Sequence, residues 1–329
     1  MRMAPAAALL LAVGAPALAQ VQPAAPRLAL PIACAIGRTC EVQNYVDRDP
    51  GPGARDYRCG GRTYDGHKGV DLRIPDMAAQ RRGVDVLAAA PGRVARLRDG
   101  EPDISIRAPG APTVAGKECG NAVVIDHGGG WETQYCHLAR GSIRVAVGQT
   151  VSTGQPVGQV GLSGATEFPH LHFQVRGQGR IVDPFGSAAG GQCGLAAAAP
   201  LWTAAAGKTL AYRAGALLNA GFADAPVEMG GLEEGRVTPP TARSAMLVVY
   251  GRAIGLQKGD VLELALAAPD GRVLAQRRLA PLDRDKAQYM AYVGKTRSGA
   301  AWPRGLYRAQ VRVRRADRVV LQKDFAARL

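Results

Sequence analysis

The sequence is poor in histidine, in aromatic side chains and in long hydrophobic runs. It holds 5 histidines in 329 residues, and none lies in the C-terminal third. Aromatic residues make up 5% of the chain, and no pattern of stacking aromatics accompanies the basic residues, which argues against a protein that binds nucleic acid. After the N-terminus, no apolar run reaches the ~20 residues of a membrane-spanning helix. Cysteine is absent after residue 193, so the part that follows depends on its hydrophobic core alone.

Residues 1–19 have the pattern of a secretory signal peptide. Arg2 gives a positive start, residues 6–13 form a short apolar core, and residues 17–19 (Ala-Leu-Ala) make a small-residue cleavage site. An uncleaved membrane anchor is the alternative, but the apolar run is short for a span. We therefore expect an exported protein, periplasmic or secreted.

The cysteine content agrees with an oxidising compartment. An even number of cysteines in an exported chain predicts disulfides. The six cysteines are Cys34, Cys40, Cys59, Cys119, Cys136 and Cys193. We expect the pairs Cys34–Cys40, Cys59–Cys119 and Cys136–Cys193. A structural zinc site is the alternative, and the lack of any Cys-x-x-Cys pair counts against it.

The pattern of short apolar segments between turn residues predicts a mainly β protein. Glycine (42) and proline (22) are abundant, which favours turns over long helices. Residues 20–58 are a Pro/Ala-rich leader, which we expect to be extended or mobile, followed by a disulfide-tied loop. Residues 59–190 predict a compact antiparallel β-sheet domain. A small-residue linker follows, and the alternating strands of residues 201–329 predict an immunoglobulin-like β-sandwich.

The positive charge is concentrated near the C-terminus. Residues 242–329 hold 18 Lys+Arg and 7 Asp+Glu, a net charge of +11, whereas the whole chain carries +14. Basic and apolar residues alternate in Tyr307–Val313, as expected of a sandwich with one face in water. The alternative is a surface that attracts an anionic envelope polymer or lipid.

All five histidines fall between residues 67 and 172. The segment Pro169–Val175 indicates a short strand, in which residues two apart share a face, so His170 and His172 would lie side by side. His67 and Asp71 can turn toward one point, and both side chains are normal zinc ligands. His137 closes the return strand of a hairpin, where alternation would place it on one face with Thr133 and Tyr135. Each pattern alone is explained equally well by structural residues.

Taken together, these ordered motifs resemble the lysostaphin-type (LytM-like) zinc metallopeptidases, which cut peptide cross-links in bacterial cell walls. The similarity covers roughly residues 60–186. The segments that carry it are His67–Asp71, Asn121–Gly128, Tyr135–Leu138, Gly154–Gly158, Gly161, Ser163–Gly164 and Pro169–Phe173. The resemblance implies that His67, Asp71 and His172 hold one zinc ion, and that His137 and His170 sit beside its open coordination position.

The resemblance also implies an endopeptidase that hydrolyses peptidoglycan cross-links with metal-activated water. Two histidines and one carboxylate leave the fourth coordination place for water, as in catalytic zinc sites. The chain has no His-Glu-x-x-His motif, so an imidazole must act as the base. We assign His137 and His170 to activating the water, stabilising the oxyanion and protonating the leaving amine. The sequence leaves open which of the two does which.

The remaining candidates receive structural roles. The resemblance places His127 in the Asp-His-Gly turn at the end of a strand. We expect Cys136 to face away from His137 and to form a disulfide, and Tyr64 and Trp131 to pack in the core rather than line a groove. Two other functions stay open: a catalytically silent regulator or binder of other wall hydrolases, and an enzyme directed at an exported protein. We expect a monomer.

Overall fold

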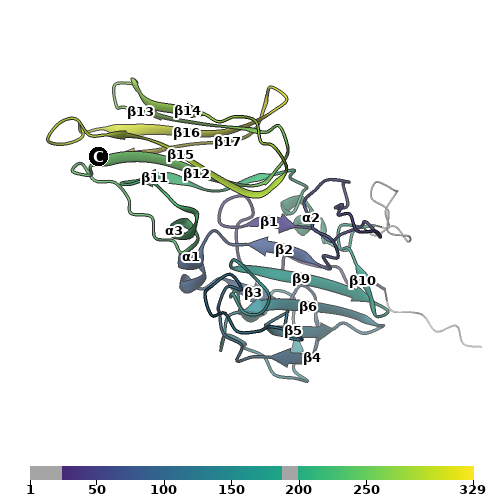
Figure 1. Ribbon diagram of the computed structural model, residues 1–329. Helices are drawn as coiled ribbons and strands as arrows, with labels where there is room; N and C mark the ends of the chain where they lie inside the picture. Colours follow the sequence, from purple (N-terminus) through teal and green to yellow (C-terminus); the bar gives the residue numbers. More distant parts are fainter. Residues whose placement is uncertain (1–23, 187–198) are drawn as a thin grey trace, which may run out of the picture.

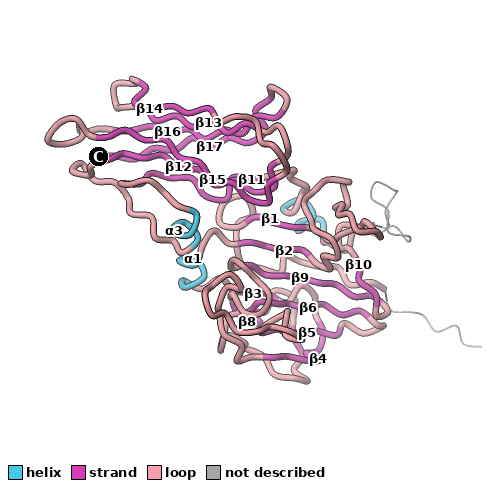
Figure 2. Tube along the Cα trace, viewed as in Figure 1, coloured by secondary structure: helices cyan, strands magenta, loops and turns pink. Residues whose placement is uncertain are grey.

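The structure, a computed structural model, describes residues 24–186 and 199–329. The predicted signal peptide, most of the linker and Cys193 lie outside the described residues. Strands dominate what is described, and Figure 2 shows only short helices between them. The helices are α1 (Met77–Arg82), α2 (Ala204–Thr209) and α3 (Met229–Glu233). The predicted mainly β class is confirmed. No helix in the described ranges has the length and apolar character required to cross a membrane.

An antiparallel sheet of eight strands makes up most of the N-terminal part (Figure 1). Its order is β1-β2-β9-β6-β5-β4-β7, and β10 pairs with β9. The strands are β1 (Glu41–Asn44), β2 (Val70–Arg73), β4 (Gly92–Arg98), β5 (Asn121–Asp126), β6 (Trp131–Leu138), β7 (Thr150–Val151), β9 (His170–Gly177) and β10 (Arg180–Val182). A separate pair consists of β3 (Asp85–Leu87) and β8 (Pro156–Gln159).

The two faces of β9 have opposite characters. Leu171 and Phe173 are fully buried in the hydrophobic core, and Phe173 lies opposite Tyr135 of β6. Because side chains alternate along a strand, His170 and His172 point to the other face. The antiparallel register fixes their neighbours, since Asp71 of β2 lies opposite His172. The central strand thus anchors the sheet with one face and presents the histidines with the other.

The described part of the predicted leader is packed rather than mobile. Leu28 and Ile32 are at most 1% exposed, Leu28 bridges Trp202, and Ile32 bridges Val86 of β3. We expected an extended or mobile segment; the described residues 24–33 pack on the first core because two apolar side chains find partners there. Trp202 and the α2 residue Ala206 belong to the same hydrophobic cluster, so the start of the second half of the chain also packs on this core.

Two disulfides are described. Cys34–Cys40 is confirmed, with Cα atoms 6.1 Å apart. Cys119 pairs with Cys136, with Cα atoms 4.9 Å apart, so the predicted pairs Cys59–Cys119 and Cys136–Cys193 are wrong. The reason is the antiparallel β5–β6 hairpin, which brings the residues before β5 beside the end of β6.

Two further sheets form the C-terminal part and share the second hydrophobic cluster. One contains β11 (Ala216–Ala223), β12 (Met246–Leu256) and β15 (Lys286–Thr296); the other contains β14 (Val273–Arg278), β13 (Val261–Ala267), β16 (Leu306–Arg315) and β17 (Arg318–Arg328). Figure 1 shows them as two layers beyond β1. The immunoglobulin-like assignment of this part stays a prediction.

The two parts of the chain meet at α1 and α3, which are neighbours in Figure 1. The Arg81 guanidinium of α1 donates a hydrogen bond of 2.8 Å to the carbonyl of Glu234, directly after α3. An added Cβ at Gly235 would come within 2.5 Å of the Ala78 side chain, so the backbones approach closely here. Helix α3 therefore joins the C-terminal sheets to the sheet that carries the histidines.

We predict that Leu28→Ala destabilises the N-terminal part by about 2–5 kcal/mol, because it opens a cavity in a packed core. Val147→Ala is the matched control: Val147 is 63% exposed, and its truncation should change the stability by less than about 0.5 kcal/mol. Urea unfolding followed by circular dichroism measures both. Equal midpoints for the two variants would contradict the packed arrangement of residues 24–33.

Candidate metal centre

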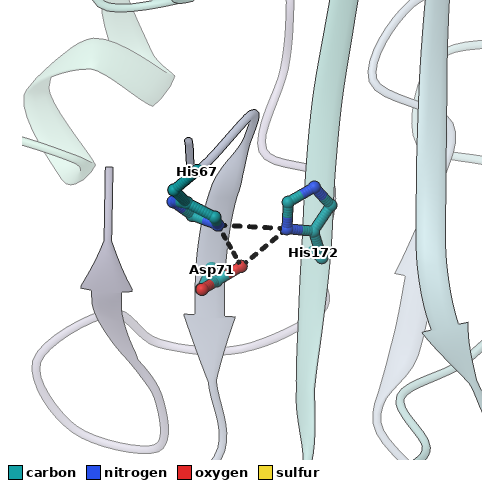
Figure 3. Close-up of side chains that lie close together, drawn as sticks. All are labelled: His67, Asp71 and His172. Carbon is teal, nitrogen blue, oxygen red and sulfur yellow. Dashed lines mark hydrogen bonds and ion pairs between the residues drawn. The ribbon is translucent and has the colours of Figure 1, made fainter. Parts of the chain in front are cut away.

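Three side chains from the loop before β2, from β2 and from β9 converge on one point (Figure 3). His67 Nε2 lies 3.1 Å from Asp71 Oδ1, and His172 Nδ1 lies 2.9 Å from the same oxygen. The two nitrogens are 3.2 Å apart. All three groups are largely buried, so a shared charge here is shielded from bulk water.

The end of β1 orients two of these groups. The Tyr45 carbonyl accepts a hydrogen bond from His67 Nδ1 at 2.7 Å, which leaves the lone pair of Nε2 facing the other two groups. The Asn44 amide donates to Asp71 Oδ2 at 2.9 Å and leaves Oδ1 facing inward. Such outer contacts fix ligand orientation in metal sites.

Close backbone approach fixes the third group. His172 turns Nδ1 toward Asp71, and its other nitrogen lies against Gly69. A Cβ at Gly69 would come within 2.6 Å of His172 Nε2 and 2.7 Å of the Phe173 carbonyl oxygen. Only glycine leaves room for this ring orientation, so the glycine between His67 and Asp71 has a steric role.

The donor set fits a divalent metal ion. Three lone-pair atoms face one another at 2.9–3.2 Å, close to the roughly 3.4 Å between ligand atoms of a tetrahedral ion with bonds of about 2.1 Å. Burial raises the pKa of Asp71, but the neighbouring imidazoles outweigh it and hold that pKa well below its usual value. Burial lowers the pKa of His172, which favours the neutral, ligating imidazole. His67, Asp71 and His172 would hold such an ion.

Two more imidazoles stand beside this centre. The His137 and His170 ring centroids are 4.7 Å apart, and His170 Nε2 lies 3.5 Å from Asp71 Oδ1. His137 Nδ1 donates to the Ser163 carbonyl at 2.7 Å, and His170 Nδ1 donates to the Phe168 carbonyl at 3.0 Å. Because a carbonyl only accepts, both rings carry their proton on Nδ1 and keep a lone pair on Nε2.

The electrostatic surroundings keep His137 neutral. Burial lowers its pKa well below the usual value, and the nearby His170 and His172 lower it further. A neutral imidazole with a free Nε2 is equipped to accept a proton. The structure thus gathers all five predicted site residues around one point, although their separate roles stay predictions.

The backbone at His137 departs from strand geometry. Its φ is +61°, and the β5–β6 register shifts between Asn121 and Val123. The expectation that His137 shares a face with Tyr135 is wrong, since Tyr135 packs in the core against Phe173. This twist lets Cys136 and His137 line the same groove, so the expectation that Cys136 faces away from His137 is also wrong.

The groove over the site has a volume of about 290 Å³. Tyr64 lines it and is 54% exposed, which contradicts the expectation of core packing. Trp131 does pack against the core, as predicted. His127 Nδ1 donates to the Pro91 carbonyl at 2.7 Å, and its Nε2 accepts from the Thr133 hydroxyl at 2.8 Å. These bonds tie the turn after β5 to its neighbours, which fits a structural role.

The sequence interpretation missed the groups that orient the five side chains. Asn44 acts through its amide, and its position at the end of a short strand could have suggested a polar contact. Tyr45, Ser163 and Phe168 act through backbone carbonyls, which carry no signal in the side-chain sequence.

Comparison with known proteins places this site in a family. The sequence profile described as Peptidase family M23 matches residues 65–184. The chain therefore contains an M23 (LytM-type) peptidase domain, and the predicted resemblance is confirmed. The match spans the three donor residues and both neighbouring imidazoles.

Several curated proteins share this domain. The chain is 45% identical over 64 residues to the peptidoglycan DD-endopeptidase ShyA of Vibrio cholerae, covering 20% of this chain and 14% of that protein. It is 42% identical over 65 residues to the murein hydrolase activator EnvC of Escherichia coli, covering 20% and 15%. Matched segments span 14–20% of the length of such relatives.

Among solved structures, the catalytic domain of the prophage-encoded M23 protein EnpA from Enterococcus faecalis, solved as a point mutant, is similar. The sequence identity is 24% and the TM-score is 0.32; the match covers 49% of this chain and 94% of that one.

We predict that Gly69→Ala weakens divalent metal binding by about 10- to 100-fold, because the added methyl group displaces the His172 ring. Isothermal titration with Zn²⁺ measures the affinity. Gly230→Ala is the control, since a Cβ at Gly230 meets nothing within 4 Å. Unchanged affinity in Gly69→Ala would mean that His172 does not ligate through Nδ1.

Proposed function

We propose that the protein is a zinc-dependent endopeptidase that hydrolyses peptide cross-links of bacterial peptidoglycan. The observation that carries the proposal is the convergence of His67, Asp71 and His172 on one point, with the imidazoles of His137 and His170 beside it. His67, His137 and His172 also line the groove over the site. The M23 match and the peptidoglycan endopeptidases among the relatives support the substrate class. The Cys119–Cys136 disulfide supports an exported, periplasmic or secreted location.

The proposed roles of the metal ion and of the two neighbouring imidazoles follow from the orientations of the rings. A bound zinc ion supplies a lowered water pKa, from about 15.7 toward about 7, and polarisation of the scissile carbonyl. His137, which lines the groove, and His170, whose Nε2 lies 3.5 Å from Asp71 Oδ1, take the base role and the later donation to the leaving amine. Their Nδ1–H bonds to backbone carbonyls hold the tautomer that this role needs.

A catalytically silent regulator is the alternative, since the activator EnvC is among the relatives. The complete set of three donors and two neighbouring imidazoles favours the enzyme, because a binder has no need for free imidazole nitrogens around a metal centre. Zinc content of the purified protein separates the two, as does cleavage of cross-linked wall peptides.

We predict that His172→Ala abolishes zinc binding, because it removes one of three donors. His137→Ala should retain zinc and yet lower turnover by roughly 10²- to 10⁴-fold, the range of general acid–base catalysis. Metal analysis and mass spectrometry of fragments released from defined wall peptides give the two readouts.

The control for this pair is His127→Ala, whose imidazole bonds to Pro91 and Thr133 away from the groove. It should keep both zinc and turnover once folded. Full turnover in His137→Ala would refute the assigned role. Turnover of wild-type protein that survives a chelator would refute the zinc mechanism.

We further propose that the outer face of β13, β14 and β16 contacts an anionic polymer of the cell envelope. Two adjoining hollows of about 500 and 450 Å³ share Ala265 and Gln310 as lining residues. Arg312 lines the first and Arg308 the second. Small alanine side chains leave the hollows open, and guanidinium groups suit carboxylate or phosphate ligands.

We predict that Arg308→Gln with Arg312→Gln weakens co-sedimentation with purified sacculi by at least about threefold at low salt, because two cations leave the face. Arg243→Gln with Arg284→Gln removes the same charge from loops outside these strands and should leave binding closer to wild type. Equal losses in both double variants would mean that net charge, not this face, governs binding.

A further inference from the structure

A buried cation lies between the candidate site and the C-terminal part. Arg73 ends β2 and is fully buried. Its guanidinium donates to Glu233 Oε2 at 2.6 Å and to Gln43 Oε1 at 3.1 Å. Glu233 is the last residue of α3, so this pair joins the sheet of the candidate site to the second half of the chain.

The same carboxylate also holds a second buried guanidinium. Arg252 of β12 is fully buried and donates to Glu233 Oε2, to Asn219 Oδ1 and to the Pro75 carbonyl. Among the described residues, no Asp or Glu side chain other than that of Glu233 forms a hydrogen bond or ion pair with Arg73 or Arg252. Removing the charge of Glu233 would therefore leave two buried cations without their anion, which is strongly unfavourable.

Arg73 in turn contacts the segment that holds His170. Its guanidinium carbon lies 3.7 Å from the centroid of the Phe168 ring, a cation–π contact. Arg73 is also the register partner of His170 across β2 and β9. The Phe168 carbonyl accepts a hydrogen bond from His170 Nδ1 at 3.0 Å and one from the Thr166 hydroxyl, which lies 3.1 Å from the same nitrogen. The residue that Arg73 contacts therefore helps to set the tautomer and the direction of the His170 ring.

We propose that Glu233 and Arg73 are positioning residues, through which α3 of the C-terminal part holds Phe168 and so aims His170 at the metal centre. The inference rests on the proposed function of His170 and deepens it. Without Glu233, Arg73 loses the anion that holds its guanidinium beside Phe168. The aromatic contact then weakens, and with it the position of the carbonyl that bonds to His170.

The primary test compares Glu233→Gln with Glu234→Gln in the full-length zinc protein on a defined cross-linked wall peptide. Glu234 also faces α1, through Arg81 at 3.8 Å, but its side chain is 45% exposed and is not a partner of Arg73. We expect Glu233→Gln to lower kcat about tenfold with unchanged KM and zinc content, because a catalytic group is misplaced while the donors stay intact. Glu234→Gln should match wild type. Equal kcat for both variants would overturn the inference.

A second readout needs no turnover. With five histidines in the chain, their side-chain ¹⁵N signals can be followed one by one. Glu233→Gln should shift the His170 signals and leave those of His67 and His172 in place. Unshifted His170 signals would overturn the inference. Inactive wild-type protein that still shows the His170 shift would refute the proposed function and leave the positioning role standing.

Phe168→Leu keeps α3 and its charges and removes only the ring, so it tests the route if Glu233→Gln does not fold. We expect the same fall in kcat with zinc retained. The double variant Glu233→Gln with Phe168→Leu should fall no further than Phe168→Leu alone, because the two changes act on one path. Additive losses, or wild-type kcat in Phe168→Leu, would show that Glu233 does not act through Phe168.

Discussion

The buried carboxylate of Asp71 is the interaction on which the rest of the site depends. It lies within 2.9–3.5 Å of nitrogens on three histidines, His67, His170 and His172. A charge removed from water in this way persists only where cations or hydrogen-bond donors compensate for lost solvation; the Asn44 amide donates to Asp71 Oδ2, and a metal ion between the three donors would supply the cation. The register of β2 and β9 keeps these groups together, because a slip of one residue would turn His170 and His172 into the core and Leu171 toward the groove. Burial of the apolar face of β9 in the core therefore fixes the register that keeps His170 and His172 at the site.

The groups that surround the imidazoles determine which nitrogen of each ring is free to bind a metal or accept a proton. The four imidazoles of the site would be interchangeable if only proximity mattered. Backbone carbonyls distinguish them: those of Tyr45, Ser163 and Phe168 each take one Nδ1 proton, whereas His172 turns Nδ1 inward because Gly69 leaves room behind its ring. Chain geometry thus sets which nitrogen of each ring keeps its lone pair: Nε2 in His67, His137 and His170, and Nδ1 in His172.

The sequence predicted the parts of the fold that depend on local pattern. Alternation in His170–Phe173 identified the strand and the shared face of its two histidines, and motif order identified the M23 domain. Such reasoning could not predict long-range packing. Nothing in the local pattern of the Pro/Ala-rich stretch shows that Leu28 packs beside Trp202. The cysteine pairs were predicted wrongly for the same reason, because the register of the β5–β6 hairpin places Cys136 beside Cys119. Alternation itself failed at His137, where a positive φ turns the side chain.

The C-terminal part contains no histidine and no cysteine, yet it is not independent of the candidate site. A guanidinium buried without an anion is costly, so separating Arg73 from Glu233 would be unfavourable. The Arg73–Glu233 pair therefore constrains the position of the end of β2. Strand β2 also carries Asp71. Domains joined only by a flexible linker would leave this strand end free. Placing the anion on α3 ties the end of β2 to a residue that follows Arg73 by 160 positions in the chain.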